Sequence, residues 1–552
     1  MALCGFVARA LAAALILAGA LDGQAPAAVQ VVPLTNQAIF PEAIEDDALA
    51  FACAEDPGTL AGFFAEKRLP FEPTLVRGWE GHKACHIYYE PTLKGFRASR
   101  DNAPIQGLYV TIQPTNFFAR SAIPGYNLEI AKTVLGRLPR GAQVRVGVAG
   151  HFDEEFWGPA VESHFGGLPH EFSFFATDSE TMQPWAQDHM KAGQLNGQPR
   201  TLSPRRLFEG DAEQGEQTRG LLTRLGQNGF VRSKLSWEGG GIQFAANPKN
   251  PSQTIMAVGL RRYWGPALTE AEYVYVLRVE FGADLVLNLN PTGAHADYVT
   301  AFFPQDQTVL VSTIVQNNAD LARAAAFELL DSFGDQKPPE LRRLASLLAE
   351  WAGSLTGRPL PLVNAISAAQ AVLDRPLPEN DPKLDVLVRS YVVRNCPGNP
   401  GACFAAANEM LRKDPELLRR TSTHVVGLEA RAELRQVLLG VISDQLSPAI
   451  PKEQATLDQA AKQLEAWGFR TVRVPHLTSG GELRISYVNG LLFDRRFFMP
   501  SLGLGRFEER LAAALRDDLQ GRYEIIPVDA QRVLAMNGGL HCVFGITREI
   551  EK

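Results

Sequence analysis

The chain of 552 residues has no long run of lysine and arginine, and beyond its N-terminus it has no long apolar run. The missing basic run disfavours a nucleic-acid partner, since such proteins carry basic patches interleaved with aromatic residues, and the formal net charge here is −7. No stretch reaches the roughly 20 apolar residues that a membrane-spanning helix needs. With 45% hydrophobic and 21% charged residues, the composition is that of a globular protein with room for more than one domain.

The N-terminus has the pattern of a cleavable secretory signal. Arg9 is followed by the apolar run Ala10–Ala20 and then by small residues and Pro26. The alternative is a short membrane anchor, but the run is too short for one. We therefore expect residues 1–28 to be removed, no membrane span in the mature protein, and a secreted or periplasmic location.

Cysteine is also scarce, with six residues, of which Cys4 would leave with the signal. Five cysteines cannot all pair with one another. Cys542 has no obvious partner and is either a reactive thiol or a buried inert one. Two pairs are plausible disulfides in an oxidising compartment: Cys53 with Cys85, and Cys396 with Cys403.

Short apolar runs alternate with amphipathic stretches from about residue 107, which predicts an α/β fold. The predicted strands are Gln143–Gly150, Glu171–Asp178, Thr254–Gly259, Ala283–Asn290, Gln307–Ile314, Phe469–Pro475 and Tyr523–Asp529. The predicted helices are Asn127–Leu138, Leu457–Gly468 and Phe507–Leu519.

The composition divides the chain further. Residues 317–446 are rich in Ala, Leu, Arg and Glu with Pro-rich breaks, which predicts an inserted helical segment. It separates two parts of one catalytic domain, residues 105–316 and 447–552. Residues 29–104 show few periodic elements and are expected to form a small N-terminal extension.

Five stretches place polar residues beside glycine at the edge of an apolar run. Taken singly, each has an ordinary explanation, such as a turn-capping carboxylate, a loop acid or a satisfied His–Asp hydrogen bond. The stretches are PWAQDHM with Asp188, SWEGGGIQF with Glu238, PTGAHADYVTAFFP with His295 and Asp297, LRISYVNGLLF with Asn489, and NGGLHCVFG with Cys542.

Their spacing is regular. The polar positions recur about every 50 to 65 residues once the predicted insertion is removed. This recurrence suggests a cyclic array of strand–helix modules, each supplying one side chain to a shared axis.

This set of side chains suits a guanidinium substrate. A guanidinium is a planar cation with its N–H groups in a rigid fork, so Asp188 and Asp297 can hold it by charge-assisted hydrogen bonds. Its carbon is a poor electrophile, and the Cys542 thiolate is the soft nucleophile that it requires. His295, oriented by Glu238, would protonate the departing ammonia and then activate water. No metal or organic cofactor is required.

The motifs W-x-x-D, E-G-G, H-x-D, S-Y-x-N and G-G-x-H-C, in this order, resemble the guanidino-group-modifying (pentein) superfamily. The resemblance covers about residues 105–320 and 450–552, and it implies a fivefold pseudosymmetric α/β propeller. It also implies a role for each matching residue: guanidinium binding by Asp188 and Asp297 beside Trp185, acid–base catalysis by His295 with Glu238, support by Asn489, and nucleophilic attack by Cys542.

Within the superfamily, three motifs resemble agmatine deiminases and the related secreted bacterial peptidylarginine deiminases. By contrast, Gln187 stands where agmatine deiminases usually have Arg, and WAQDHM and HADYVTAFFP resemble protein-arginine deiminases. The favoured reaction is therefore conversion of peptidyl-arginine to peptidyl-citrulline, which makes arginine-containing proteins the expected partners.

Several alternatives remain open. The substrate could be a small guanidino compound such as agmatine or free arginine, or the enzyme could be an amidinotransferase. A cysteine peptidase would use Cys542 and His295 but leave the carboxylates without a role. A secreted guanidinium-binding scaffold and a metal site built from His295, Asp297 and Glu238 are further alternatives.

Overall fold

The computed structural model describes residues 29–34, 48–101, 103, 105–112, 114–118, 121–124, 127–138, 140–148, 165–176, 185–205, 230–259, 268–292, 295–303, 307–314, 450–479, 482–501, 505–530, 533 and 538–548. The predicted signal peptide, the predicted helical insertion and the Cys396–Cys403 pair lie outside these residues. The chain divides into two compact units, residues 1–91 with 264–280 and residues 92–263 with 281–552.

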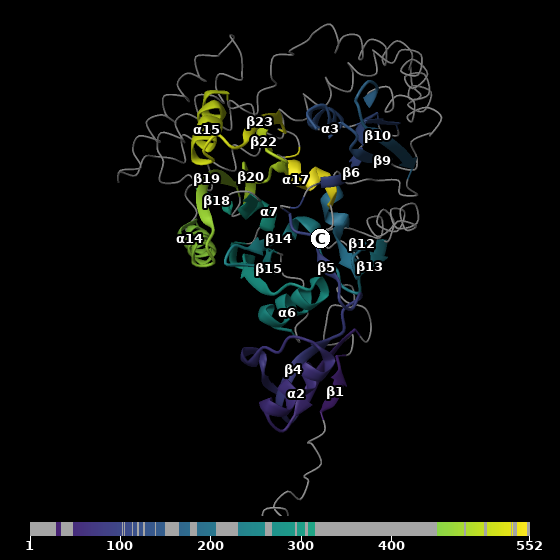
Figure 1. Ribbon diagram of the computed structural model, residues 1–552, viewed down its shortest axis with the longest axis vertical. Coiled ribbons are helices and arrows are strands. Elements are labelled where there is room, and N and C mark those ends of the chain that lie inside the picture. The colour runs from purple at the N-terminus through teal and green to yellow at the C-terminus, as the bar shows by residue number, and fades with distance from the viewer. Residues whose placement is uncertain are drawn as a thin grey trace, which may run out of the picture. The chain divides into compact units, whose positions relative to one another are not determined.

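The smaller unit is built on a four-stranded antiparallel sheet (Figure 1). Its strands lie in the order β1 (Gln30–Pro33), β2 (Leu49–Ala54), β4 (His82–Tyr89) and β3 (Arg77–Trp79), with helix α2 (Pro57–Lys67), the 3-10 turn η1 (Pro73–Leu75) and most of α6 (Glu270–Phe281). Helix α2 begins where the Asp56 side chain accepts from Thr59 N at 3.0 Å. It ends at Arg68, whose φ of 57° is left-handed.

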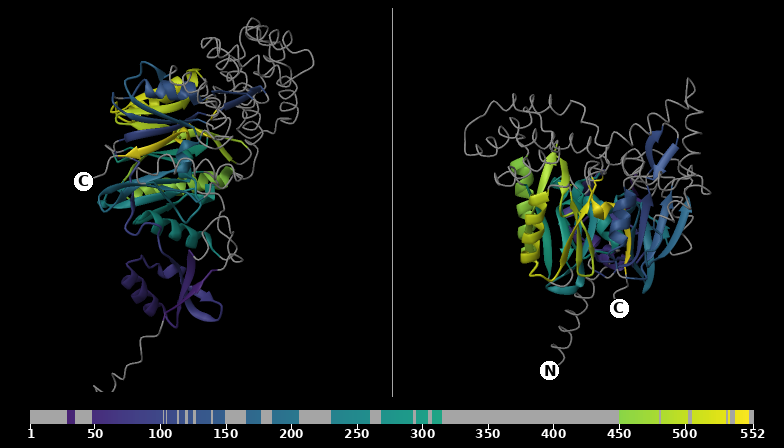
Figure 2. Two further views of the ribbon diagram at one scale, coloured as in Figure 1. Left: turned by 90° about the vertical axis from the view of Figure 1, so that its right-hand side faces the viewer. Right: turned by 90° about the horizontal axis from the view of Figure 1, so that it is seen from above.

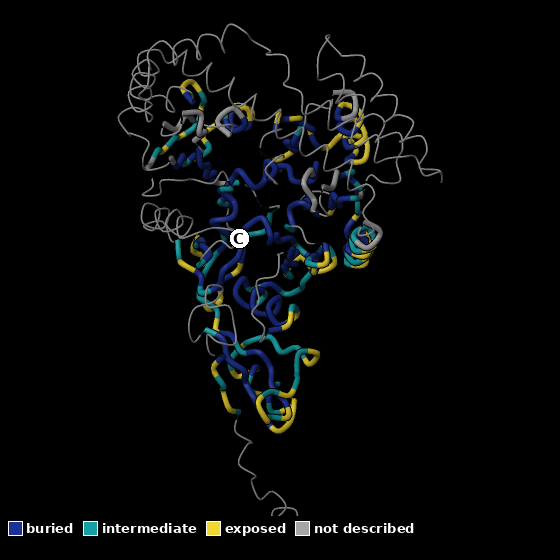
Figure 3. Tube along the Cα trace, turned by 180° about the vertical axis from the view of Figure 1, so that it is seen from behind, coloured by how far each residue is buried: buried dark blue, intermediate teal, exposed yellow. Residues whose placement is uncertain are grey.

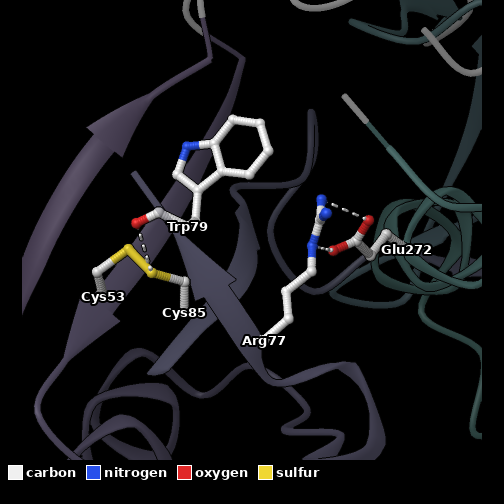
Figure 4. Close-up of a disulfide and its surroundings, with 5 residues drawn as sticks. All are labelled: Cys53, Arg77, Trp79, Cys85 and Glu272. Carbon is white, nitrogen blue, oxygen red and sulfur yellow. Dashed lines mark hydrogen bonds and ion pairs between the residues drawn. A yellow bond between two sulfur atoms is a disulfide. The ribbon is translucent and has the colours of Figure 1, made fainter. Parts of the chain in front are cut away.

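Helix α6 joins this sheet through buried polar contacts, although it is about 200 residues away in sequence. Arg77 makes a two-pronged ion pair with Glu272, with Nε–Oε1 at 2.8 Å and Nη2–Oε2 at 3.1 Å (Figure 4). The Tyr89 hydroxyl donates to Glu280 Oε2 at 2.8 Å, and both residues are fully buried. The unit therefore ends at residue 91 and takes in residues 264–280, whereas the sequence predicted an extension covering 29–104.

Cys53 and Cys85 form a disulfide inside the smaller unit (Figure 4). The two cysteines are directly opposite each other on the antiparallel strands β2 and β4, and both are buried. The bridge links residues that are 32 apart in sequence. Among the described residues, Cys542 is the cysteine that forms no disulfide.

Reducing this disulfide is expected to destabilise the smaller unit by about 3 to 4 kcal/mol, because the unfolded chain regains the entropy of a loop of this length. Scanning calorimetry of the whole chain, with and without dithiothreitol, should show one thermal transition moving to lower temperature. The Cys53→Ser/Cys85→Ser variant should reproduce the shift and should not respond to reductant. Identical transitions in both conditions would contradict the expectation.

Five sheets of the larger unit, counted over the described residues, share one strand pattern: an antiparallel pair followed by a parallel third strand. The sets are β11 (Lys191–Leu195), β12 (Gln198–Ser203) and β13 (Phe230–Arg232); β14 (Ile242–Asn247), β15 (Asn250–Val258) and β16 (Leu285–Asn288); β17 (Thr300–Phe303), β18 (Thr308–Ile314) and β19 (Arg470–Ser479); β21 (Leu491–Phe493), β22 (Arg496–Ser501) and β23 (Glu524–Asp529); and β24 (Phe544–Arg548), β6 (Ile105–Ile112) and β9 (Gln143–Val148).

Further elements extend this pattern. Strands β5 (Arg97–Ala98), β20 (Glu482–Ser486) and β10 (Glu171–Ala176) add to three of the sheets, and β7 (Pro114–Phe118) pairs with β8 (Ser121–Pro124). Helices α3 (Asn127–Leu135), α14 (Ile450–Ala466) and α15 (Gly505–Asp518) each precede a parallel strand and pack on their sheets (Figure 2). The predicted strands and helices correspond to observed ones, and the fold is α/β.

The larger unit is held by apolar residues between its sheets and helices (Figure 3). One cluster joins strands β6, β9, β22 and β23 to helices α3 and α15, and a second joins β15, β16 and β18 to α14. The second cluster includes Cys542, so the thiol borders on the core. Among the described residues, no helix is both long and apolar enough to cross a membrane.

Candidate active site

Each candidate side chain lies in a short segment that leads into the first strand of one of the five sheets. The segments are η2 (Ala186–His189) before β11, η4 (Gly239–Gly241) before β14, α7 (Ala296–Val299) before β17, the turn at residues 487–489 before β21, and α17 (Leu540–Val543) before β24. η2 and α17 both pack against η4, which also contacts α7. Five segments far apart in sequence therefore come together.

Gly240 lies at the centre of the site. Its backbone N–H donates to Asp188 Oδ1 at 2.7 Å. A methyl group at its Cα would lie 2.8 Å from His295 Nδ1, 3.0 Å from Asp297 Oδ2 and 3.1 Å from Asp188 Oδ1. The two carboxylates and the imidazole therefore face one point, and only glycine leaves that point open.

His295 and Glu238 form a close ion pair. His295 Nε2 donates to Glu238 Oε2 at 2.5 Å, so Nδ1 is the ring nitrogen that faces the centre of the site. Burial lowers the pKa of His295, but the charges of Glu238, Asp188 and Asp297 outweigh it and raise the value to about 10. The imidazole is thus held protonated, ready to donate a proton.

Asp297 connects the histidine side of the site to the thiol. Its Oδ2 accepts from His541 Nδ1 at 2.9 Å and lies 3.4 Å from Cys542 Sγ. Its Oδ1 is buried without a hydrogen-bond partner. A buried, unsatisfied carboxylate oxygen is costly, and a donor group of a bound molecule would satisfy it.

Asn489 lies on the other side of the thiol. Its Nδ2 donates to Cys542 Sγ at 3.3 Å, and its Oδ1 accepts from His541 N at 3.1 Å. The backbone oxygen of Asn489 also accepts from Leu540 N at 2.9 Å. The amide thus fixes the start of α17 and supports negative charge on the sulfur.

Two glycines allow α17 to approach its neighbours closely. A methyl group at Gly539 would lie 2.4 Å from Asn489 Oδ1, and one at Gly538 would lie 1.9 Å from the Trp185 ring. Trp185 thus packs against the loop that carries the nucleophile candidate. Its predicted contact with substrate stays a prediction.

The thiol of Cys542 is 3% exposed. Burial raises its pKa well above the usual value, and Asp297 and Asp188 raise it further, while the hydrogen bond from Asn489 opposes them. A guanidinium bound between the two carboxylates would offset part of their negative charge and so lower the thiol pKa. The site favours the thiolate when a cation is present.

The sequence did not single out two side chains of the site, His541 and Lys191. His541 belongs to the G-G-x-H-C motif, from which no role follows for it, yet its hydrogen bond orients Asp297. Lys191 is 4% exposed, and the charges of Asp101, Asp297 and Asp188 act on its pKa. The sequence offers one weak indication of Lys191: a charged residue three positions after Asp188, at the start of strand β11. Among the described residues, no group of three or more His, Cys, Asp or Glu side chains is arranged to hold a metal ion.

Residues 411–545 match the sequence model of the family described as Porphyromonas-type peptidyl-arginine deiminase. The match contains Asn489, His541 and Cys542, and it begins inside the stretch predicted as an insertion. That boundary stays a prediction. No curated protein is similar enough to the chain to count as a match.

Solved structures of agmatine and arginine deiminases align with most of the chain at low identity. An agmatine deiminase of C. jejuni has 13% identity over 83% of this chain and 97% of its own, with a TM-score of 0.44. The putative arginine deiminase from Porphyromonas gingivalis has 13% identity over 82% and 98%, with a TM-score of 0.45. An agmatine deiminase of Enterococcus faecalis has 11% identity over 82% and 96%, with a TM-score of 0.42. Similarities this low leave activity and substrate open.

The resemblance that the motifs predicted is confirmed: the chain is similar to the guanidino-group-modifying (pentein) superfamily. Within it, the segment that carries the thiol is similar to the Porphyromonas-type peptidyl-arginine deiminase family.

Proposed function

We propose that the chain is a deiminase that hydrolyses a guanidinium group, converting peptidyl-arginine to peptidyl-citrulline and ammonia. The observation that carries the proposal is the convergence on Gly240 of two buried carboxylates and a protonated imidazole, with a buried thiol 3.4 Å from one of the carboxylates. Two carboxylates fit the forked N–H groups of a guanidinium, and a buried thiol suits attack on its carbon. The match to a deiminase family supports the same reaction class.

The proposed reaction proceeds in two steps. The Cys542 thiolate adds to the guanidinium carbon, the C–N bond to the terminal amine breaks, and His295 donates its proton so that ammonia leaves. A thiouronium then links the sulfur to the substrate carbon. His295, now neutral, takes a proton from water, and the hydroxide adds to that carbon. The C–S bond then breaks as the added hydroxyl group loses its proton to solvent, which releases the ureido product and the thiolate.

The peptidyl form of the substrate is supported by Gln187. The Gln187 amide is oriented so that its nitrogen donates to Phe544 O and its oxygen accepts from Lys191 Nζ, both inside the fold. The position that usually carries arginine in agmatine deiminases therefore holds an inward-facing amide. The signal-like N-terminus supports action on arginine-containing proteins outside the cytoplasm, and fractionation with N-terminal sequencing of the mature protein would test this location.

Ammonia release tests the proposal directly. Purified protein would be given a blocked arginine peptide, free arginine and agmatine, with Cys542→Ala alongside. Release from the blocked peptide is the expected result. Release from agmatine or arginine alone would move the enzyme to small-molecule metabolism. Failure with all three would overturn the deiminase proposal and favour amidino transfer, tested by adding an acceptor amine, or guanidinium binding.

We also propose that the five sheets of the larger unit form a ring of five modules. The shared strand pattern supports this arrangement, as does the position of each candidate side chain before a first strand. An experimental structure in which the five sheets do not surround one axis would overturn it.

The pH dependence of kcat/KM should have two limits. Burial, with the nearby Glu238, raises the pKa of Asp188 to about 7 although His295 opposes the shift, so below that pH the carboxyl is neutral and holds a guanidinium weakly. Above about 10, His295 loses the proton that ammonia needs. Activity should therefore rise through pH 7 and fall through pH 10.

Glu238→Gln checks the upper limit. It removes the largest contribution that raises the pKa of His295, so the falling limb should move to lower pH. The rising limb should also move to lower pH, because Glu238 raises the pKa of Asp188. The substrate should be a peptide whose arginine stays charged over the whole pH range, so that ionisation of the substrate does not contribute to the pH profile. A falling limb that does not move would contradict the assignment of His295.

A further inference from the structure

Lys191, two residues after the segment η2 that carries Asp188, is a buried basic side chain that the reaction above does not use. It is the first residue of β11 and is 4% exposed. Burial lowers its pKa, while Asp101, Asp297 and Asp188 raise it and Arg548 opposes them. Long charged side chains are rarely buried without a function in the structure or the chemistry.

The ammonium of Lys191 is linked to the segment that carries the thiol. Lys191 Nζ donates to Gln187 Oε1 at 2.8 Å, and Gln187 Nε2 donates to Phe544 O at 2.8 Å. Phe544 is the first residue after α17, two positions beyond Cys542. A short chain of hydrogen bonds thus runs from the buried charge to the end of the nucleophile-bearing turn.

Close backbone packing surrounds this chain. A methyl group at Gly239 would lie 1.9 Å from Gln187 O, and one at Gly545 would lie 2.4 Å from Met190 Sδ. The segment from residue 186 to 190 is therefore pressed between the E-G-G turn and the first residues of β24. Its polar side chains have a fixed geometry, and a change at Lys191 has little room to be absorbed.

Lys191 also changes the balance of buried charge. Asp188, Glu238 and Asp297 are three buried carboxyl groups, and His295 supplies one positive charge. Ionisation of the buried thiol would add a fourth negative charge to this group. A buried ammonium reduces that cost.

We propose that Lys191 is a positioning residue that fixes the nucleophile turn through Gln187 and supports ionisation of the Cys542 thiol. The inference rests on the proposed role of Cys542 as nucleophile. It assigns no contact between Lys191 and the substrate.

The test is the rate at which iodoacetamide alkylates Cys542, measured against pH without substrate and located by mass spectrometry of the Cys542 peptide. In Lys191→Met, which keeps a long apolar side chain, the midpoint should rise by about one pH unit and the rate at pH 8 should fall about tenfold. With substrate, kcat should fall and KM should change little. Lys462→Met, an exposed lysine of α14 in the same unit, should match the wild type.

Two further variants separate charge from packing. Lys191→Ala should regain alkylation rate with ethylammonium and not with ethanol, because only the cation restores the charge. Gln187→Leu should lower kcat while leaving the alkylation midpoint near that of the wild type. These variants keep the inference testable if Lys191→Met does not fold.

An unchanged alkylation profile in folded Lys191→Met, or equal rescue by ethanol, would overturn the inference. Its failure is distinct from failure of the proposed function. Alkylation needs no substrate, so a chain that releases no ammonia from any guanidino compound would still give a wild-type profile against which Lys191→Met can be compared.

Discussion

Replacing Cys542 with alanine is expected to abolish ammonia release, with a loss of about 10⁴-fold or more in kcat, while the chain stays folded. The sulfur is the nucleophile in the proposed reaction, and no hydroxyl or second described thiol lies within its contacts. The change removes one small buried atom, so its effect on stability should be modest. Asn489 and Asp297 each lose a weak sulfur hydrogen bond and retain contacts to His541.

The measurement is single-turnover release of ammonia at saturating substrate, together with thermal unfolding. Val543→Ala, the adjacent buried residue in α17, is a matched control, because it creates a cavity in the same turn without removing the thiol. It should lose stability and keep most of its activity. Retention of turnover by Cys542→Ala at more than a few per cent would exclude covalent catalysis by this residue. Cys542→Ser should be nearly as inactive, because a buried serine hydroxyl stays protonated.

The side chains that converge could be identified from the sequence because they recur at a regular interval. Asp188, Glu238 and His295 lie in three different segments, each just before the first strand of a sheet. Their regular spacing in the sequence reflects this repeated position. The interval carries no information about side chains that act from inside a strand. Lys191 could therefore not be identified, since its burial depends on how β11 packs in the fold and its pKa on the charge of Asp101, 90 residues away in sequence.

The same contrast holds for the fold: elements with a clear local sequence pattern could be predicted, and features that depend on contacts between distant residues could not. Helices such as α14 and α15 have one apolar face, and strands such as β9 are short β-branched runs, so both types could be predicted. Strand β2 is buried at every position, and its sequence LAFACA does not alternate. The assignment of α6 to the smaller unit depends on the Arg77–Glu272 pair, which joins residues 195 apart.

Adding one methyl group at Gly240 is expected to lower activity strongly, although less than removing the thiol. In Gly240→Ala the new carbon would lie 2.8 to 3.1 Å from His295, Asp297 and Asp188, closer than carbon normally approaches nitrogen or oxygen. The three side chains must move apart, and a displacement of about 1 Å is enough to lower catalysis about 10²-fold. We expect a loss of about 10²- to 10³-fold in kcat/KM.

The matched control is Gly62→Ala in helix α2, where an added methyl group meets nothing within 4 Å. Alanine favours helix over glycine, so that variant should be as active as the wild type and no less stable. Gly240→Ala could be inactive because the surrounding side chains are displaced or because the methyl group blocks the substrate. Since the variant keeps every ionisable group, the alkylation midpoint of Cys542 separates these two causes. A midpoint near that of the wild type with a raised KM would mean that the methyl group blocks the guanidinium position between the carboxylates. Full activity in Gly240→Ala would mean that substrate does not bind where Asp188, Asp297 and His295 meet, and the assignment of this site would fail.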